Sequence, residues 1–215
     1  MTEARINLIK KLYNIETDNE TISKTERFIK LFVEYNSHTN LMSKNDIEFL
    51  FEKHIIDSLS VVLFDKFLAS GTILDVGCGG GFPSVILSIF YPDKNIIAMD
   101  SVAKKINFIN YVKSELKLLN LRPMLTRVED YPPLDVDIVV NRAVGKIKDI
   151  WKYSKKHLKT DGYFISYKAK TAETEAYEAA QKYAELCELS FIKYNLPLDE
   201  NYTRELVIFK NRTPF

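Results

Sequence analysis

The stretch Leu74-Asp75-Val76-Gly77-Cys78-Gly79-Gly80-Gly81-Phe82-Pro83 decides the fold of this chain. An apolar run from Thr72 leads into it and predicts a strand over 72–76, and the glycines predict a turn whose backbone takes positive φ and approaches a ligand closely. Proline in the first helical turn loses no hydrogen bond, so a helix is expected to begin near Phe82-Pro83. Asp100 follows Gly77 by 23 positions and ends the next apolar run, where a carboxylate can accept hydrogen bonds from ribose hydroxyls. Strand, turn, helix and acid together predict a nucleotide-cofactor site.

The spacing of the glycines indicates which cofactor this site takes. A dinucleotide fingerprint requires a small third residue after Gly77 and Gly79, but the bulky Phe82 stands there. The pattern is Gly-x-Gly-x-Gly with an acid before it, and it resembles the first motif of class I S-adenosylmethionine-dependent methyltransferases. No Gly-Lys-Ser/Thr follows, which excludes a P-loop. A glycine turn that serves packing alone is the alternative, and the placement of Asp100 argues against it. We expect the chain to bind S-adenosylmethionine and not NAD.

Length and composition describe a globular protein. With 215 residues and 46% hydrophobic content, the chain can form one domain of ordinary size with a small extension. The longest apolar stretch, 85–91, is far shorter than the ~20 residues of a membrane span, and residues 1–5 lack the apolar segment of a secretion signal. Two cysteines, Cys78 and Cys187, suggest neither a disulfide framework nor a metal site. We expect a cytoplasmic protein without membrane or metal, while the net charge of +1 neither predicts nor excludes a nucleic-acid partner.

Two zones differ in their apolar periodicity. Residues 1–67 show helical spacing and are predicted to form a helical N-terminal extension, and residues 68–215 alternate between strand and helix patterns. The expected strands are 72–76, 95–100, 123–127, 136–141, 162–168, 188–194 and 204–210, with helices near 83–90, 102–118, 146–158 and 172–187. This alternation predicts an α/β fold with a Rossmann-like, doubly wound, seven-stranded sheet and a ligand site at the carboxyl ends of its strands. The loop 196–201 is too short for a helical crossover, so the last strand is expected to be antiparallel.

Several segments together resemble one family, the RsmG (GidB) methyltransferases. They are His54-Ile55-Ile56-Asp57-Ser58, the glycine stretch through Phe82-Pro83, Asp100-Ser101 with Lys104-Lys105, Arg127-Val128-Glu129, Asn141-Arg142-Ala143 and Lys168. The similarity extends in order from about Tyr35-Asn36 to Arg204. It implies transfer of a methyl group from S-adenosylmethionine to N7 of a guanine in 16S ribosomal RNA, with that RNA or the 30S particle as partner.

The resemblance also implies roles for individual residues. The positions that resemble the family's cofactor contacts are Gly77, Phe82, Val128 and Glu129. The other residues expected to contact the cofactor are Gly79 of the glycine turn and Asp100 at the end of the next strand. Arg142 resembles an arginine at the junction of cofactor and substrate, and it is expected to act in catalysis together with Lys168. The residues expected to face the RNA are Arg127, Lys168 and Arg204. Ser84 departs from the family, where glycine is common, and is expected to leave the site intact.

The chemistry of guanine N7 agrees with what the sequence lacks. N7 carries an in-plane lone pair, so no proton has to be removed before attack, and catalysis is mainly alignment. The Asp/Asn-Pro-Pro-Tyr/Phe motif typical of amine methylation is absent after 136–141, where Asn141-Arg142-Ala143 stands. Cys78 and Cys187 are interpreted as packing residues and not as nucleophiles. A donor on N7 would occupy the attacking lone pair, so Arg142 is expected to contact O6, a phosphate or the cofactor carboxylate, with a surface ion pair as the alternative.

Three questions stay open at the level of sequence. His54 and Asp57 lie three positions apart on one helical face and form either a catalytic pair or an anchor between the extension and the sheet, and we favour the anchor. A methyltransferase for a small molecule or a protein is the alternative enzyme. A ribosome-assembly protein without catalysis is the alternative outside enzymes.

Overall fold

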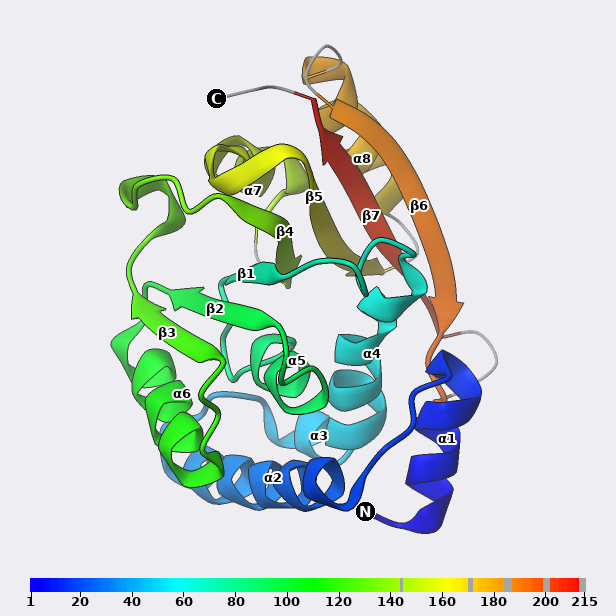
Figure 1. The fold of residues 1–215 in the computed structure, drawn as a ribbon, viewed down its shortest axis with the longest axis vertical. Coiled ribbons are helices and arrows are strands. Elements are labelled where there is room, and N and C mark those ends of the chain that lie inside the picture. The colour runs from blue at the N-terminus through cyan, green and yellow to red at the C-terminus, as the bar shows by residue number, and fades with distance from the viewer. Residues whose placement is uncertain (144, 170–171, 184–186, 199–201, 213–215) are drawn as a thin grey trace.

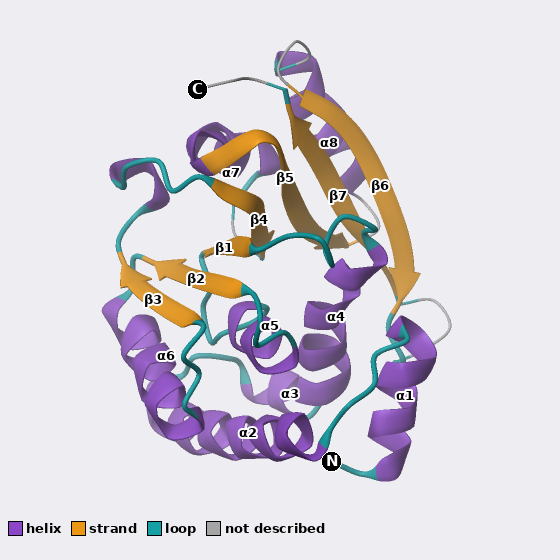
Figure 2. Ribbon diagram, in the orientation of Figure 1, coloured by secondary structure: helices purple, strands orange, loops and turns teal. Residues whose placement is uncertain are grey.

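The computed structural model describes residues 1–143, 145–169, 172–183, 187–198 and 202–212, and it forms a twisted sheet with helices on both faces (Figures 1 and 2). The strands are β1 (Thr72–Val76), β2 (Asn95–Asp100), β3 (Leu121–Leu125), β4 (Val136–Arg142), β5 (Leu158–Ala169), β6 (Cys187–Asn195) and β7 (Thr203–Asn211). Their order is β3-β2-β1-β4-β5-β7-β6. The pairings among β1 to β5 are parallel, and β7 is antiparallel to both β5 and β6. The predicted seven-stranded sheet with its reversed last strand is confirmed.

Alternating residues of the strands bury two different apolar faces. Ile73 of β1 belongs to a cluster with the helices α5 (Ser84–Phe90) and α6 (Ala103–Leu116). Its neighbour Leu74 belongs to the opposite cluster, with α7 (Ile147–Ser154) and α8 (Ala172–Lys182). Both faces of the sheet are therefore covered, as parallel strands that read as continuous apolar runs require.

The first part of the chain is helical, as predicted. It contains α1 (Glu3–Tyr13), α2 (Asn19–Thr39), α3 (Lys44–Ile47), a π-helical turn η1 (Leu50–Ile55), α4 (Ile56–Leu59) and a 3-10 turn η2 (Ser60–Leu63). Figure 1 shows α2 passing beneath α5 and α6, where Phe28 and Phe32 meet the ring of Phe82 with centroids 5.4 and 5.3 Å apart. The helices thus continue the core on the α5–α6 face of the sheet, next to the glycine turn.

Some predicted boundaries differ from the structure. β3 covers 121–125 and not 123–127, because Leu121 is buried and pairs with Ile96, and Pro123 is tolerated in a strand at the edge of the sheet. Arg127 consequently lies beyond the strand, directly before the 3-10 turn η3 (Val128–Asp130). Cys187 begins β6, although the sequence predicted it at the end of a helix. In the part of the chain that the structure describes, no helix is both long and apolar enough to cross a membrane.

Candidate active site

The glycine turn after β1 takes the backbone conformation that its sequence predicts. Gly77, Gly79 and Gly81 have φ of 73°, 54° and 93°, values that favour glycine over other residues. The backbone N–H of Gly77 donates to the carbonyl of Met99 at 2.8 Å, which ties the turn to the end of β2. A Cβ added to Gly80 would lie 2.5 Å from the ring of Phe32, so this glycine allows α2 to approach. The turn is therefore both an open backbone surface and a packing site.

Asp100 stabilises the turn from the end of β2. Its Oδ2 accepts from the Gly79 N–H at 3.1 Å and from Lys105 Nζ at 3.2 Å, and its Oδ1 accepts from the Val102 N–H at 2.9 Å. Asp100 is 5% exposed, and it lines the cavity described next. A carboxylate has about four acceptor positions, so it retains capacity for a ligand donor.

A cavity of about 440 Å³ opens at the carboxyl ends of β1, β2 and β4, and we call it the first cavity. Its lining includes Gly77, Met99, Asp100, Val128, Glu129 and Ile150. Apolar side chains together with the carboxylates of Asp100 and Glu129 fit the adenosine part of S-adenosylmethionine, whose base is apolar on its faces and whose ribose presents hydroxyls.

Two contacts that the sequence did not suggest hold the backbone of Val128 and Glu129, which line the first cavity. His157 Nε2 lies 2.9 Å from the carbonyl oxygen of Val128, and Lys156 Nζ donates to the carbonyl of Glu129 at 2.7 Å. Both residues belong to the 3-10 turn after α7, and His157 is fully buried. A lone buried histidine gives no sequence signal of its partner, because the partner lies 29 positions away.

A second cavity of about 300 Å³ adjoins the first one, and the two share Gly77, Lys105 and Ala143 in their linings. The N-terminal helices and the segments between them supply one wall, with Phe32, Met42, Ser43, Asp46 and His54. The remaining wall includes the glycine turn, Phe82 and Arg142. The two cavities therefore adjoin at the edge of the sheet where β1 and β4 end.

Arg142 lies at the end of β4 with its guanidinium held on several sides. Its Nε donates to the carbonyl of Phe82 at 3.3 Å, and one terminal nitrogen donates to the carbonyl of Lys53 at 3.4 Å. The same nitrogen lies 3.3 Å from Asp57 Oδ2, and the other lies 2.7 Å from His54 Nδ1. Because arginine only donates, Nδ1 of His54 must accept and its ring proton stands on Nε2. Burial, followed by the nearby charge of Arg142, lowers the pKa of His54 to about 3, so the imidazole is neutral.

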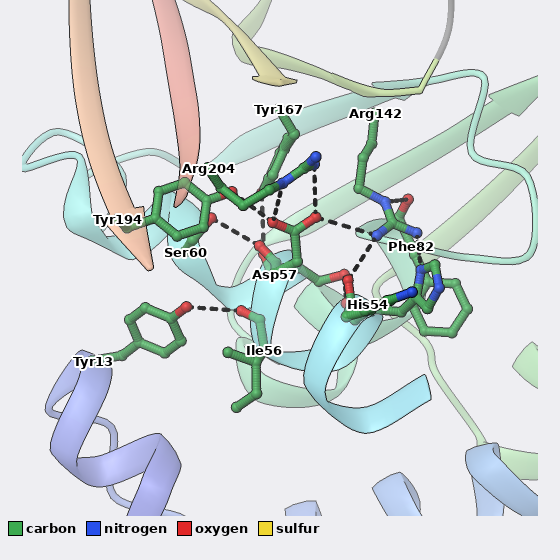
Figure 3. A network of polar contacts seen from close by, with 12 residues as sticks. Tyr13, His54, Ile56, Asp57, Ser60, Phe82, Arg142, Tyr167, Tyr194 and Arg204 are labelled. Carbon is green, nitrogen blue, oxygen red and sulfur yellow. Dashed lines mark hydrogen bonds and ion pairs between the residues drawn. The ribbon is translucent and has the colours of Figure 1, made fainter. Parts of the chain in front are cut away.

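Asp57 is the centre of this polar network, as Figure 3 shows. Its side chain is 1% exposed, and it accepts from Tyr194 at 2.6 Å and from Arg204 at 3.2 and 3.1 Å, besides Arg142. The network joins α4 to β4, β6 and β7. This agrees with the interpretation of His54 and Asp57 as an anchor between the N-terminal helices and the sheet.

The other predicted cations lie in different surroundings. Arg127 is 65% exposed on its side chain and lies 3.4 Å from Glu129. Lys168 donates to Glu175 at 3.1 Å and to the carbonyl of Gly145, a residue that borders the first cavity. Arg204 directs its guanidinium to the buried Asp57, so only Arg127 of the three presents a largely free charge to solvent. Their predicted roles toward RNA stay predictions.

Asp75, the acid before the glycines, supports the helix and does not reach the cavities. It is fully buried, and its Oδ2 accepts from the backbone N–H of Ser84 at 3.1 Å, at the start of α5. Burial raises the pKa of Asp75 to about 7. Ser84 is buried as well, so the serine that departs from the family lies under the turn and not in the site.

The sheet order with its reversed β7, the glycine turn and the acid at the end of β2 define a class I S-adenosylmethionine-dependent methyltransferase. A crystal structure of M. jannaschii TYW2 in complex with AdoMet shares this fold, with a TM-score of 0.53 and 19% identity over 66% of this chain and 69% of that one.

Sequence comparisons identify the family within this class. Residues 21–206 match the family described as GidB, rRNA small subunit methyltransferase G. A ribosomal RNA small subunit methyltransferase G of Desulforamulus reducens is 35% identical over 90% of this chain and 83% of its own length. The protein of the same name from Haemophilus influenzae (strain PittEE) is 37% identical over 79% of this chain and 83% of its own. The chain belongs to the GidB family of small-subunit rRNA methyltransferases.

Proposed function

We propose that this chain transfers the methyl group of S-adenosylmethionine to N7 of a guanine in 16S ribosomal RNA. Membership of the GidB family carries the proposal. The two adjoining cavities support it, because a cofactor in the first and a base in the second would meet at Gly77 and Ala143. The substrate is the small-subunit RNA or the 30S particle, and the place of action is the cytoplasm.

The linings of the two cavities support the proposed cofactor residues. S-adenosylmethionine supplies, when bound, a methyl group on a positively charged sulfur. Asp100, Val128 and Glu129 line the first cavity, where Asp100 would accept from the ribose hydroxyls and the other two would border the adenine. The methionine part would extend to the boundary of the two cavities, where Gly77 lines both. Gly79, Phe82 and Arg142 line the second cavity and are proposed to contact the methionine part from that side.

The hydrogen bonds of His54 and Asp57 favour a nucleophile that uses neither group as a base. Asp46 also lines the second cavity, and its lowered pKa makes it a weak base. His54 is neutral, but its basic nitrogen Nδ1 is occupied by Arg142. Asp57 is occupied by two guanidiniums and a tyrosine hydroxyl. Neither group is free to take a proton from a substrate. Guanine N7 needs no deprotonation, so alignment with the methyl group is sufficient.

Arg142 and Lys168 are the residues that we place at the reaction. Four of the five N–H groups of Arg142 have acceptors among the described residues, which leaves one for O6 of the base or the cofactor carboxylate. Lys168 lies beside the first cavity, because its Nζ donates to the carbonyl of Gly145, which belongs to the lining of that cavity. Arg127 and Arg204 are proposed to face the RNA, the former through its exposed side chain.

Methyl transfer by the purified protein tests the proposal. Small-subunit particles from cells lacking the protein are incubated with S-adenosylmethionine carrying a labelled methyl group, and the labelled nucleoside and its position are identified after digestion. N7-methylguanosine at one position is the expected product. Label in another nucleoside, in protein or in a small molecule without RNA would contradict the proposal.

A further inference from the structure

The second cavity has walls suited to a flat base and a carboxylate at its edge. Its wall includes the half-buried Met42 and the edges of Phe32 and Phe82, which are 0% and 4% exposed, whereas Asp46 contributes a negative charge. The side chain of Asp46 is 42% exposed, so a ligand in the cavity can reach its oxygens. Asp46 is absent from the lining of the first cavity.

Local hydrogen bonds fix the position of the Asp46 carboxylate. The hydroxyl of Ser43 donates to Asp46 Oδ2 at 2.7 Å, and the backbone N–H of Asp46 donates back to the Ser43 hydroxyl at 3.3 Å. This reciprocal pair caps the short helix α3. Lys53 Nζ lies 3.4 Å from Oδ1. The bond from Ser43, more than the charge of Lys53, holds the pKa of Asp46 below its usual range, so the group is an ionised acceptor.

An ionised carboxylate distinguishes guanine from the other purine by its hydrogen-bond pattern. Guanine presents two adjacent donors, the N1–H and the N2 amine, which one carboxylate can accept together. Adenine presents an acceptor at N1 and no amine at C2, so it would place a lone pair against the charge. A site built to accept hydrogen bonds strongly disfavours a ligand that lacks the donors.

We propose that the second cavity receives the target base and that Asp46 recognises the N1–H and N2 amine of guanine there. This inference rests on the proposed function and adds the residue that selects the base. With its Watson–Crick edge on Asp46, the base would lie against the apolar wall that includes Met42. Its N7 is left free of protein donors, as transfer to N7 requires. Ser43 is a positioning residue that holds the carboxylate in place.

Replacing guanosine by inosine at the acceptor position tests the assignment, because inosine keeps N1–H, O6 and N7 but lacks the N2 amine. Particles are reconstituted with 16S RNA carrying either nucleoside at the mapped position. The kcat/KM for methylation is measured with the wild type, Asp46→Ala, Asp46→Asn and the control Asp65→Asn. Asp65 is a suitable control because it is exposed and pairs only with Lys66 among the described residues. Affinity for S-adenosylmethionine is measured by calorimetry for every variant.

The wild type and Asp65→Asn should prefer guanosine to inosine by about tenfold or more, the usual effect of one hydrogen bond to a charged group. Asp46→Ala should methylate the two at equal rates while binding the cofactor normally. Asp46→Asn should lose activity on guanosine because its amide presents a donor beside the base donors. A wild type without preference, an Asp46→Ala enzyme that keeps the preference, or a loss of cofactor affinity equal to the loss of activity would overturn the inference. A wild type that methylates no guanosine at all would contradict the proposed function itself.

Discussion

Replacing Asp57 by asparagine should destabilise the fold more than any exposed acid does. The carboxylate lies 3.3 Å from Arg142 and 3.1 Å from Arg204, whose side chains are 12% and 17% exposed. Asparagine keeps the shape but removes the charge that balances the two guanidiniums. Removing one partner of a buried ion pair costs ~3–5 kcal/mol, so we expect the free energy of unfolding to fall by that amount.

Urea unfolding followed by circular dichroism measures this loss, with the slope of the transition unchanged. Asp65→Asn is the matched control and should change the free energy of unfolding by less than ~0.5 kcal/mol, because its ion pair with Lys66 is exposed. The double variant Asp57→Asn/Arg204→Met should recover part of the loss, since it removes one of the unbalanced charges. A loss below ~1 kcal/mol in Asp57→Asn, or no recovery in the double variant, would contradict the role of Asp57 as the counter-charge of the two guanidiniums.

Three further predictions concern the cofactor site, the RNA contacts and the dependence on pH. Gly77→Val should weaken binding of S-adenosylmethionine because it strains a backbone with φ of 73°. Asp100→Ala should weaken it by losing charge-assisted hydrogen bonds of ~1.5–3 kcal/mol. Calorimetric affinities equal to that of the wild type in both variants would contradict the proposed cofactor site. Arg127→Ala should flatten the salt dependence of the Michaelis constant for particles by about one log–log unit. Arg142→Ala should instead lower the turnover number at saturating particles. Steady-state kinetics at several salt concentrations test both, and an unchanged salt dependence in Arg127→Ala or a normal turnover number in Arg142→Ala would contradict these roles. The pKa of Asp75, raised to about 7, lies above its unfolded value, so its contribution to stability is complete below pH ~4 and is lost as the pH rises through 7. The free energy of unfolding of the wild type minus that of Asp75→Asn should thus fall by on the order of 4 kcal/mol from pH 4 to pH 7, and a constant difference would contradict the buried acid.

The parts of the site that follow strands were predictable from the sequence. The apolar runs mark the strands, and parallel strands bring their carboxyl ends to one edge of the sheet. Gly77, Asp100, Val128 and Glu129 therefore line one cavity, as their places in the sequence predict. Arg142 also ends its strand as predicted, and its contact with His54 explains why two motifs 88 positions apart occur together.

The contacts made by long side chains were not predictable in the same way. Arg204 lies near a strand end, and nothing in its sequence surroundings indicates that its guanidinium contacts Asp57, 147 positions earlier. Such a pair depends on how α4 packs beside β7, which no local pattern encodes. Asp46 gave no signal either, because a single acid after Ser43 in a short helix resembles an ordinary cap.

Methylation of a guanine N7 in small-subunit ribosomal RNA by this chain can be tested in cells. The most direct test maps N7-methylguanosine in the 16S RNA of cells that lack the gene, of cells complemented with the wild type, and of cells complemented with Gly77→Val. One N7-methylguanosine should disappear in the deletion, return with the wild type and stay absent with the variant. An unchanged set of N7-methylguanosines in the deletion strain would contradict methylation by this chain.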